Sequence, residues 1–121
     1  MAPFPWHFGG QRYQNLLVEI EEIEYWSQVL GFRMCFDVSH SHLSCQHLQK
    51  DFYEFSSRIS AMTAHLHIGD AKGVNGEGLQ IGEGQIDFDY LDAVLDAKPR
   101  RGFSFTYSHF HPLFWSHKLS S

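Results

Sequence analysis

Hydrophobic residues in the first third of the chain recur at helical spacing and then form a short continuous run. The segment 19–30 sets its apolar side chains among Glu and Gln, and Gly31 follows as a stop signal, which predicts a helix. Its apolar positions are Ile20, Ile23, Trp26, Val29 and Leu30. The run 33–38 predicts a buried strand, and the polar, His-rich segment 39–46 predicts a loop.

The rest of the chain repeats this alternation of helices and strands. A second helix is predicted from the apolar stripe Leu48, Phe52, Phe55 and Ile59. A strand over 61–68 follows, and then a loop over 69–84 that holds six of the ten glycines. A third helix is predicted from the stripe Phe88, Leu91, Val94 and Leu95, with Asp87 or Asp89 as its N-cap. The last predicted strand is 102–107.

The order helix, strand, helix, strand, helix, strand predicts an α/β fold with parallel strands and helical crossovers. The final segment, 106–121, is rich in Ser, His and aromatic residues and has no regular period. No Asp or Glu occurs after residue 96. We therefore separate an α/β region, 1–105, from an atypical tail, 106–121.

Composition narrows the class of protein. The 121 residues, of which 43% are hydrophobic, are enough for one domain with a core. Fourteen acidic and nine basic residues give a net charge of −5, which counts against nucleic-acid binding. The sequence has neither a signal-peptide pattern nor an apolar run long enough for a membrane span. Cys35 and Cys45 are expected to be free thiols, which favours the cytoplasm.

The most distinctive chemistry lies at the end of the first predicted strand, where Asp37 and His40 are three residues apart. Ligand sites of parallel α/β folds lie at the C-terminal ends of strands. A carboxylate and an imidazole there suit a divalent transition metal. The plainer alternative is that Asp37 caps a helix and His40 is an ordinary loop residue.

The end of the next strand carries a second group, His65 and His67, which share one side of the strand because they are two residues apart. A single histidine there is more often a packed core residue, but a pair beside an Asp/His pair favours a metal site. Asp70 is placed to orient a ligating imidazole.

Two further segments offer candidate ligand contacts. The Gly-rich loop contains Glu77 and Glu83, which on their own are typical loop carboxylates. Trp6 and His7 could line a sugar pocket, because aromatic faces stack on sugar rings, or could simply anchor a loop.

Three segments in this order resemble the xylose isomerase-like superfamily of metal-dependent (β/α)8 barrels: 36–40, 64–72 and 81–88. The resemblance implies a partial TIM barrel that runs from after strand five to strand eight. It also implies that Asp37 and His67 are metal ligands, that His40 is a catalytic or substrate-contacting residue, and that Asp70 supports the metal site. The loop around Trp6 and His7, together with Glu83, would contact the substrate.

The sequence departs from the family pattern at two ligands. The family also uses a Glu from strand five, which would precede Met1, and a Glu from strand eight, where this chain has Thr106-Tyr107-Ser108-His109. The expected cofactor is therefore a weakly bound divalent metal (Mn, Co, Mg or Zn), and the expected form is a truncated one with an incomplete site.

The resemblance implies a sugar or sugar-phosphate isomerase or epimerase, acting on a small molecule without nucleic-acid or membrane partners. One alternative is a non-catalytic partial barrel that self-associates as a homo-oligomer or pairs with a missing barrel half. Another is a fragment of an endonuclease IV-like DNA-repair enzyme, which the acidic net charge disfavours.

Overall fold

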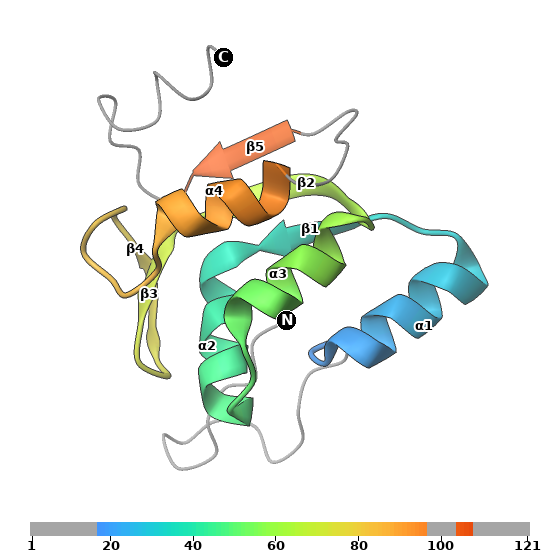
Figure 1. The fold of residues 1–121 in the computed structure, drawn as a ribbon, viewed down its shortest axis with the longest axis horizontal. Coiled ribbons are helices and arrows are strands. Elements are labelled where there is room, and N and C mark those ends of the chain that lie inside the picture. Colours follow the sequence, from blue (N-terminus) through green and yellow to red (C-terminus); the bar gives the residue numbers. More distant parts are fainter. Residues whose placement is uncertain (1–16, 97–103, 108–121) are drawn as a thin grey trace.

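The computed structural model describes residues 17–96 and 104–107 and shows a parallel sheet with helices packed against it (Figure 1). The elements in chain order are α1 (Ile20–Leu30), β1 (Met34–Asp37), α2 (Val38–Leu48), α3 (Phe52–Ser60), β2 (Thr63–Ile68), β3 (Asp70–Lys72), β4 (Gly76–Leu79), α4 (Phe88–Asp96) and β5 (Ser104–Tyr107). One sheet has the order β1-β2-β5 with parallel neighbours, and β3 and β4 form an antiparallel hairpin. The predicted parallel α/β organisation is confirmed.

The two faces of the sheet have different surroundings. Phe36, Leu66 and Ile68 are at most 4% exposed and belong to the hydrophobic core. Residues at alternate positions of a strand point to opposite faces. Asp37 and His67, which pair in register between β1 and β2, therefore lie on the other face. This second face, which we call the open face, carries the candidate chemistry.

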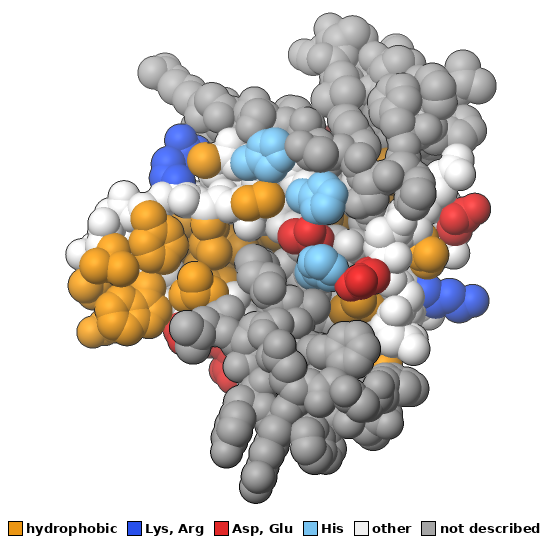
Figure 2. Space-filling view, turned by 180° about the vertical axis from the view of Figure 1, so that it is seen from behind, with side chains coloured by type: hydrophobic (Ala, Val, Ile, Leu, Met, Phe, Trp, Pro, Cys, Tyr) orange, Lys and Arg blue, Asp and Glu red, His pale blue; other side chains and the backbone are white. Residues whose placement is uncertain are grey.

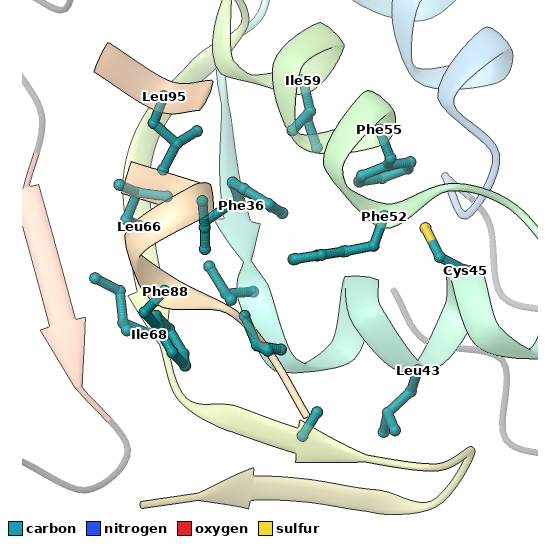
Figure 3. Close-up of a cluster of buried hydrophobic side chains, with 14 of the residues drawn as sticks. Phe36, Leu43, Cys45, Phe52, Phe55, Ile59, Leu66, Ile68, Phe88 and Leu95 are labelled. Atoms are coloured by element: carbon teal, nitrogen blue, oxygen red, sulfur yellow. The ribbon is translucent and has the colours of Figure 1, made fainter. Parts of the chain in front are cut away.

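The core lies between the sheet and the helices α2, α3 and α4 (Figure 3). Phe36 is central to it, because its ring lies 6.5 Å from that of Phe52 and 6.2 Å from that of Phe55. The other large apolar members are Leu43, Ile59, Leu66, Ile68, Phe88, Leu91 and Leu95. Three residues of the stripe predicted for the second helix, Phe52, Phe55 and Ile59, lie on α3 and belong to this core, whereas Leu48, predicted in the same helix, is the last residue of α2. Phe88, Leu91 and Leu95 of the third predicted stripe also belong to the core.

Local signals set several helix boundaries. α1 ends where Gly31 adopts a φ of 67°, a left-handed conformation that glycine takes without steric cost, and its N–H bonds to the carbonyl of Ser27. The Asp87 carboxylate accepts a hydrogen bond from Tyr90 N–H at 3.0 Å, so Asp87 rather than Asp89 is positioned as the cap of α4.

Two segments predicted as loops contain regular structure. Residues 38–48 form helix α2, because the Asp37 carboxylate caps its first turn and small Ser side chains allow close packing: Ser39, Ser41 and Ser44 are at most 2% exposed. The prediction of a loop over 39–46 was therefore wrong. The predicted Gly-rich loop 69–84 includes the hairpin of β3 and β4, whose short strands have no apolar alternation to reveal them.

Helix α1 buries apolar side chains only in its first half. Ile20 and Ile23 are buried, whereas Trp26, Val29 and Leu30, the other apolar positions of the predicted helix, are 40%, 56% and 65% exposed. The helix is joined to α3 by ion pairs from Arg58 to Glu21, at 3.3 Å, and to Glu24. In the described ranges, no helix is long and apolar enough to cross a membrane.

Candidate functional site

The candidate site lies where β1 and β2 end on the open face. Asp37 is the last residue of β1, and its register partner on β2 is His67. The parallel pairing brings the Asp37 Oδ2 within 2.5 Å of the His67 Nδ1. Because an ionised carboxylate only accepts hydrogen bonds, Nδ1 carries the hydrogen in this contact.

Asp37 also organises the start of helix α2. Its Oδ1 accepts hydrogen bonds from the His40 N–H, at 3.0 Å, and from the Ser39 hydroxyl, at 3.2 Å. Its Oδ2 lies 3.3 Å from the His40 Nδ1. The carboxylate thus contacts both the N-terminus of α2 and the two imidazoles. Asp37 therefore caps the helix, as the plainer alternative predicted, and also lies in the cluster of candidate site residues.

The electrostatics of this cluster favour an ionised Asp37. Burial alone would raise the pKa of its carboxyl, because the side chain is only 15% exposed. The hydrogen bonds from the side chain and backbone of His40, and from the His67 side chain, outweigh burial and hold the pKa of Asp37 well below its usual range. The site therefore contains a fixed negative charge.

His40 lies between two carboxylates. Its Nδ1 faces Asp37, and its Nε2 lies 2.6 Å from the Oε2 of Glu77 on β4. The hydrogen bond to Asp37 raises the pKa of His40, burial opposes this, and the charges of Asp37 and Glu77 raise it further. The His40 and Glu77 side chains are 37% and 60% exposed, so a ligand can reach both.

The result is a continuous row of four side chains, Glu77, His40, Asp37 and His67, contributed by β4, α2, β1 and β2. Histidine and acidic side chains gather together on the face of the molecule shown in Figure 2. Such a row offers acceptors for ligand hydroxyl groups and imidazoles that can give or take protons.

The structure gives Asp70 a set of partners in the Gly-rich loop. Its buried carboxylate accepts hydrogen bonds from the N–H groups of Ala71, Gly82, Gly84 and Ile86, at 2.8 to 3.2 Å. A Cβ at Gly84 would come within 2.3 Å of the Asp70 Oδ1, so the loop closes over this carboxylate only with glycine there. Asp70 fixes the loop that follows the hairpin.

The remaining predicted residues are distributed differently. Glu83 accepts a hydrogen bond from the Gln80 N–H at 3.3 Å, which is a contact within the loop. His65 pairs with Cys35 two register positions before the Asp37–His67 pair, and Cys35 is exposed. Trp6 and His7 lie outside the described residues.

Glu77 is the site residue that sequence reasoning did not select. Glu77 and Glu83 both follow a glycine in a Gly-rich segment, and neither carries a motif that separates them. Glu77 reaches His40 because the chain reverses direction in the hairpin, where Lys72 pairs with Gly76.

The donor set covers only part of a metal site. Asp37 and His67 are suitable ligand types for a divalent metal. In residues 17–96 and 104–107, however, no three His, Cys, Asp or Glu side chains are arranged to hold a metal ion. The described residues alone therefore do not complete a site, and no chemical step is assigned to a metal here.

The sequence also matches a known protein family. Residues 1–118 match the family described as xylose isomerase-like TIM barrel. The chain belongs to this family. No match was found among curated proteins or among solved structures.

Membership of the xylose isomerase-like TIM barrel family gives the two sheet faces a meaning. In a TIM barrel the helices cover the outer face of the sheet, side chains fill the interior, and the active site lies at the C-terminal ends of the strands. The core side of β1 and β2, with Phe36 and Leu66, corresponds to the helix-covered face. The open face with Asp37 and His67 corresponds to the barrel interior.

Proposed function

We propose that this chain carries part of the active site of a sugar or sugar-phosphate isomerase or epimerase, in an incomplete form. One observation carries the proposal: Asp37, His40 and His67 converge at the C-terminal ends of two parallel strands, with the Asp37 carboxylate 2.5 Å from His67. Active sites of TIM barrels occupy this position. The free thiols Cys35 and Cys45 are consistent with a cytoplasmic, reducing location.

In this proposal Asp37 and His67 are the two ligands of a weakly held divalent metal such as Mn²⁺, Co²⁺, Mg²⁺ or Zn²⁺. A bound metal would supply Lewis-acid polarisation of a substrate carbonyl. His40 contacts the substrate, and its imidazole can hold or release a proton next to a ligand hydroxyl. Because this chain has Thr106-Tyr107-Ser108-His109 where the family pattern has the strand-eight glutamate, we expect little or no turnover by this chain alone.

Calorimetric titration of the purified chain with Mn²⁺ and Co²⁺ tests this proposal. The informative variants are Asp37→Asn, which keeps an oxygen to cap α2, and His67→Ala. His65→Ala, on the same strand and the same face, is the matched control. We expect both site variants to lose binding and the control to keep it. Binding that persists in both site variants would overturn the metal assignment.

A second candidate, a non-catalytic partial barrel that pairs with another copy or another chain, is favoured by a separate observation. Tyr25, Trp26, Val29 and Leu30 are all 40% or more exposed on one side of α1. In addition, β1 is an edge strand of the described sheet. Exposed apolar surface and unpaired strand edges promote association.

Sedimentation equilibrium of the metal-free chain, next to a Val29→Lys variant, discriminates this candidate. Concentration-dependent association that Val29→Lys weakens would support pairing through α1. A chain that stays monomeric at high micromolar concentration would contradict self-association.

A further inference from the structure

The hairpin of β3 and β4 brings a carboxylate to the site from outside the sheet. Glu77 lies on β4 between Gly76 and Gly78, and its Oε2 is 2.6 Å from the His40 Nε2. Its sequence separation from His40 is 37 residues, so only the tertiary fold creates this contact.

We propose that Glu77 is a positioning residue of the ligand site: it fixes the His40 imidazole from the side opposite Asp37. An imidazole held at one nitrogen can still turn about its Cβ–Cγ bond. With Nδ1 near Asp37 and Nε2 at Glu77, the ring is held at both ends in one orientation. The two contacts fix the orientation of the His40 ring at the edge of the site.

The base of the hairpin is anchored, which distinguishes this contact from a chance surface pair. Asp70, the first residue of β3, is fully buried and binds the backbone of the following loop. The Gly73 N–H, in the turn region, donates to the Gln85 side chain at 2.7 Å. The buried bonds of Asp70 and the exposed Gly73–Gln85 bond tie β3 and the turn region to the loop that follows β4, so contacts other than the exposed Glu77 side chain anchor the hairpin that carries it.

The carboxylate of Glu77 also affects which kind of ligand the site can bind. Together, Glu77 and Asp37 place two carboxylates around one imidazole. The Glu77 side chain is 60% exposed, so its carboxylate can also accept a hydrogen bond from a ligand hydroxyl. A polyhydroxylated ligand fits this chemistry, a conclusion that rests on the proposed function.

The test measures the His40 ring itself in the ligand-free full chain. The side-chain ¹⁵N resonances of His40, identified by their loss in His40→Asn, are recorded at one fixed pH for wild type, Glu77→Gln and Glu77→Ala. Glu83→Gln is the matched control, because Glu83 is a carboxylate of the same Gly-rich segment that binds only loop backbone among the described contacts.

We expect the His40 Nε2 resonance to shift in both Glu77 variants and to stay in place in Glu83→Gln, while backbone amide signals of α2 and β2 remain unchanged in all of them. Unchanged ring resonances in both Glu77 variants would overturn the inference. Since the measurement uses no metal and no sugar, its outcome is separate from that of the metal titration. A shifted His40 resonance together with no metal binding would support the inference about Glu77 and would contradict the proposed metal site.

Discussion

At the residue scale, Asp37 connects local structure to chemistry. The same carboxylate caps α2 through its Oδ1 and contacts His67 and His40 through its Oδ2. The sequence predicted that these three residues would converge, because neighbouring parallel strands end at one edge. It could not predict Glu77, since no pattern in a Gly-rich segment gives the register of a short hairpin.

Replacement of Asp37 should separate its two roles. Asp37→Ala removes the cap of α2 and is expected to lower the free energy of unfolding by about 1 kcal/mol or more, whereas Asp37→Asn retains a capping oxygen and should cost less. Urea unfolding of the metal-free chain measures the difference. Equal losses in both variants would show that the carboxylate charge, rather than the cap, is what stabilises this end of the sheet.

A buried histidine beside the site makes stability depend on pH. His42 is 4% exposed, its ring packs 5.1 Å from that of Phe52, and its Nδ1 has no hydrogen-bond partner in the described part of the chain. Burial lowers the pKa of His42 in the folded state, although the charge of Asp70 opposes the shift. The unfolded chain therefore takes up a proton at a higher pH than the folded chain does.

The contribution of His42 to the free energy of unfolding is expected to fall as the pH drops below about 6.5, the unfolded value, towards the lower folded value. His42→Leu should lose less stability than wild type between pH 7.5 and pH 5, measured by urea unfolding at each pH. Parallel pH profiles for the two proteins would contradict the assignment of this dependence to His42.

At the scale of elements, helix α2 and the β3–β4 hairpin show where pattern reading failed. Periodic apolar stripes located α1, α3 and α4, but α2 buries serines and a histidine, which have no hydrophobic period to detect. The hairpin strands are three and four residues long, and two of the four residues of β4 are glycine. In both cases tertiary contacts, rather than local hydrophobic pattern, stabilise the element.

The loop after the hairpin depends on one buried carboxylate. Asp70→Ala would leave the N–H groups of Gly82, Gly84 and Ile86 without their acceptor, and we expect a loss of roughly 3 kcal/mol in unfolding free energy. Gly84→Ala should be similarly harmful, since its Cβ would overlap Asp70. Gly73→Ala, where the added Cβ meets no atom within 4 Å although φ is +64°, is the milder comparison. Thermal unfolding that ranks Gly73→Ala as the more damaging of the two glycine variants would contradict this account of the loop.

At the scale of the whole molecule, helices cover one face of the described sheet, and Asp37 and His67 lie on the other face, over which residues 17–96 and 104–107 place no helix. The sequence predicted the parallel α/β class and the family, because the order of motifs and the alternation of strands and helices can be recognised even where the element boundaries are inexact. It did not predict that Trp26, Val29 and Leu30 would be exposed, because helical periodicity identifies an apolar face but not whether an element covers it.

The most direct measurement of the central claim is a Mn²⁺ titration of the ¹⁵N-labelled chain followed by NMR. Paramagnetic broadening should begin at the ends of β1 and β2, at Asp37 and His67, and should disappear from these positions in Asp37→Asn. Broadening confined to histidines away from this edge, such as His47 in the last turn of α2, would contradict a metal-binding active-site remnant at the strand ends.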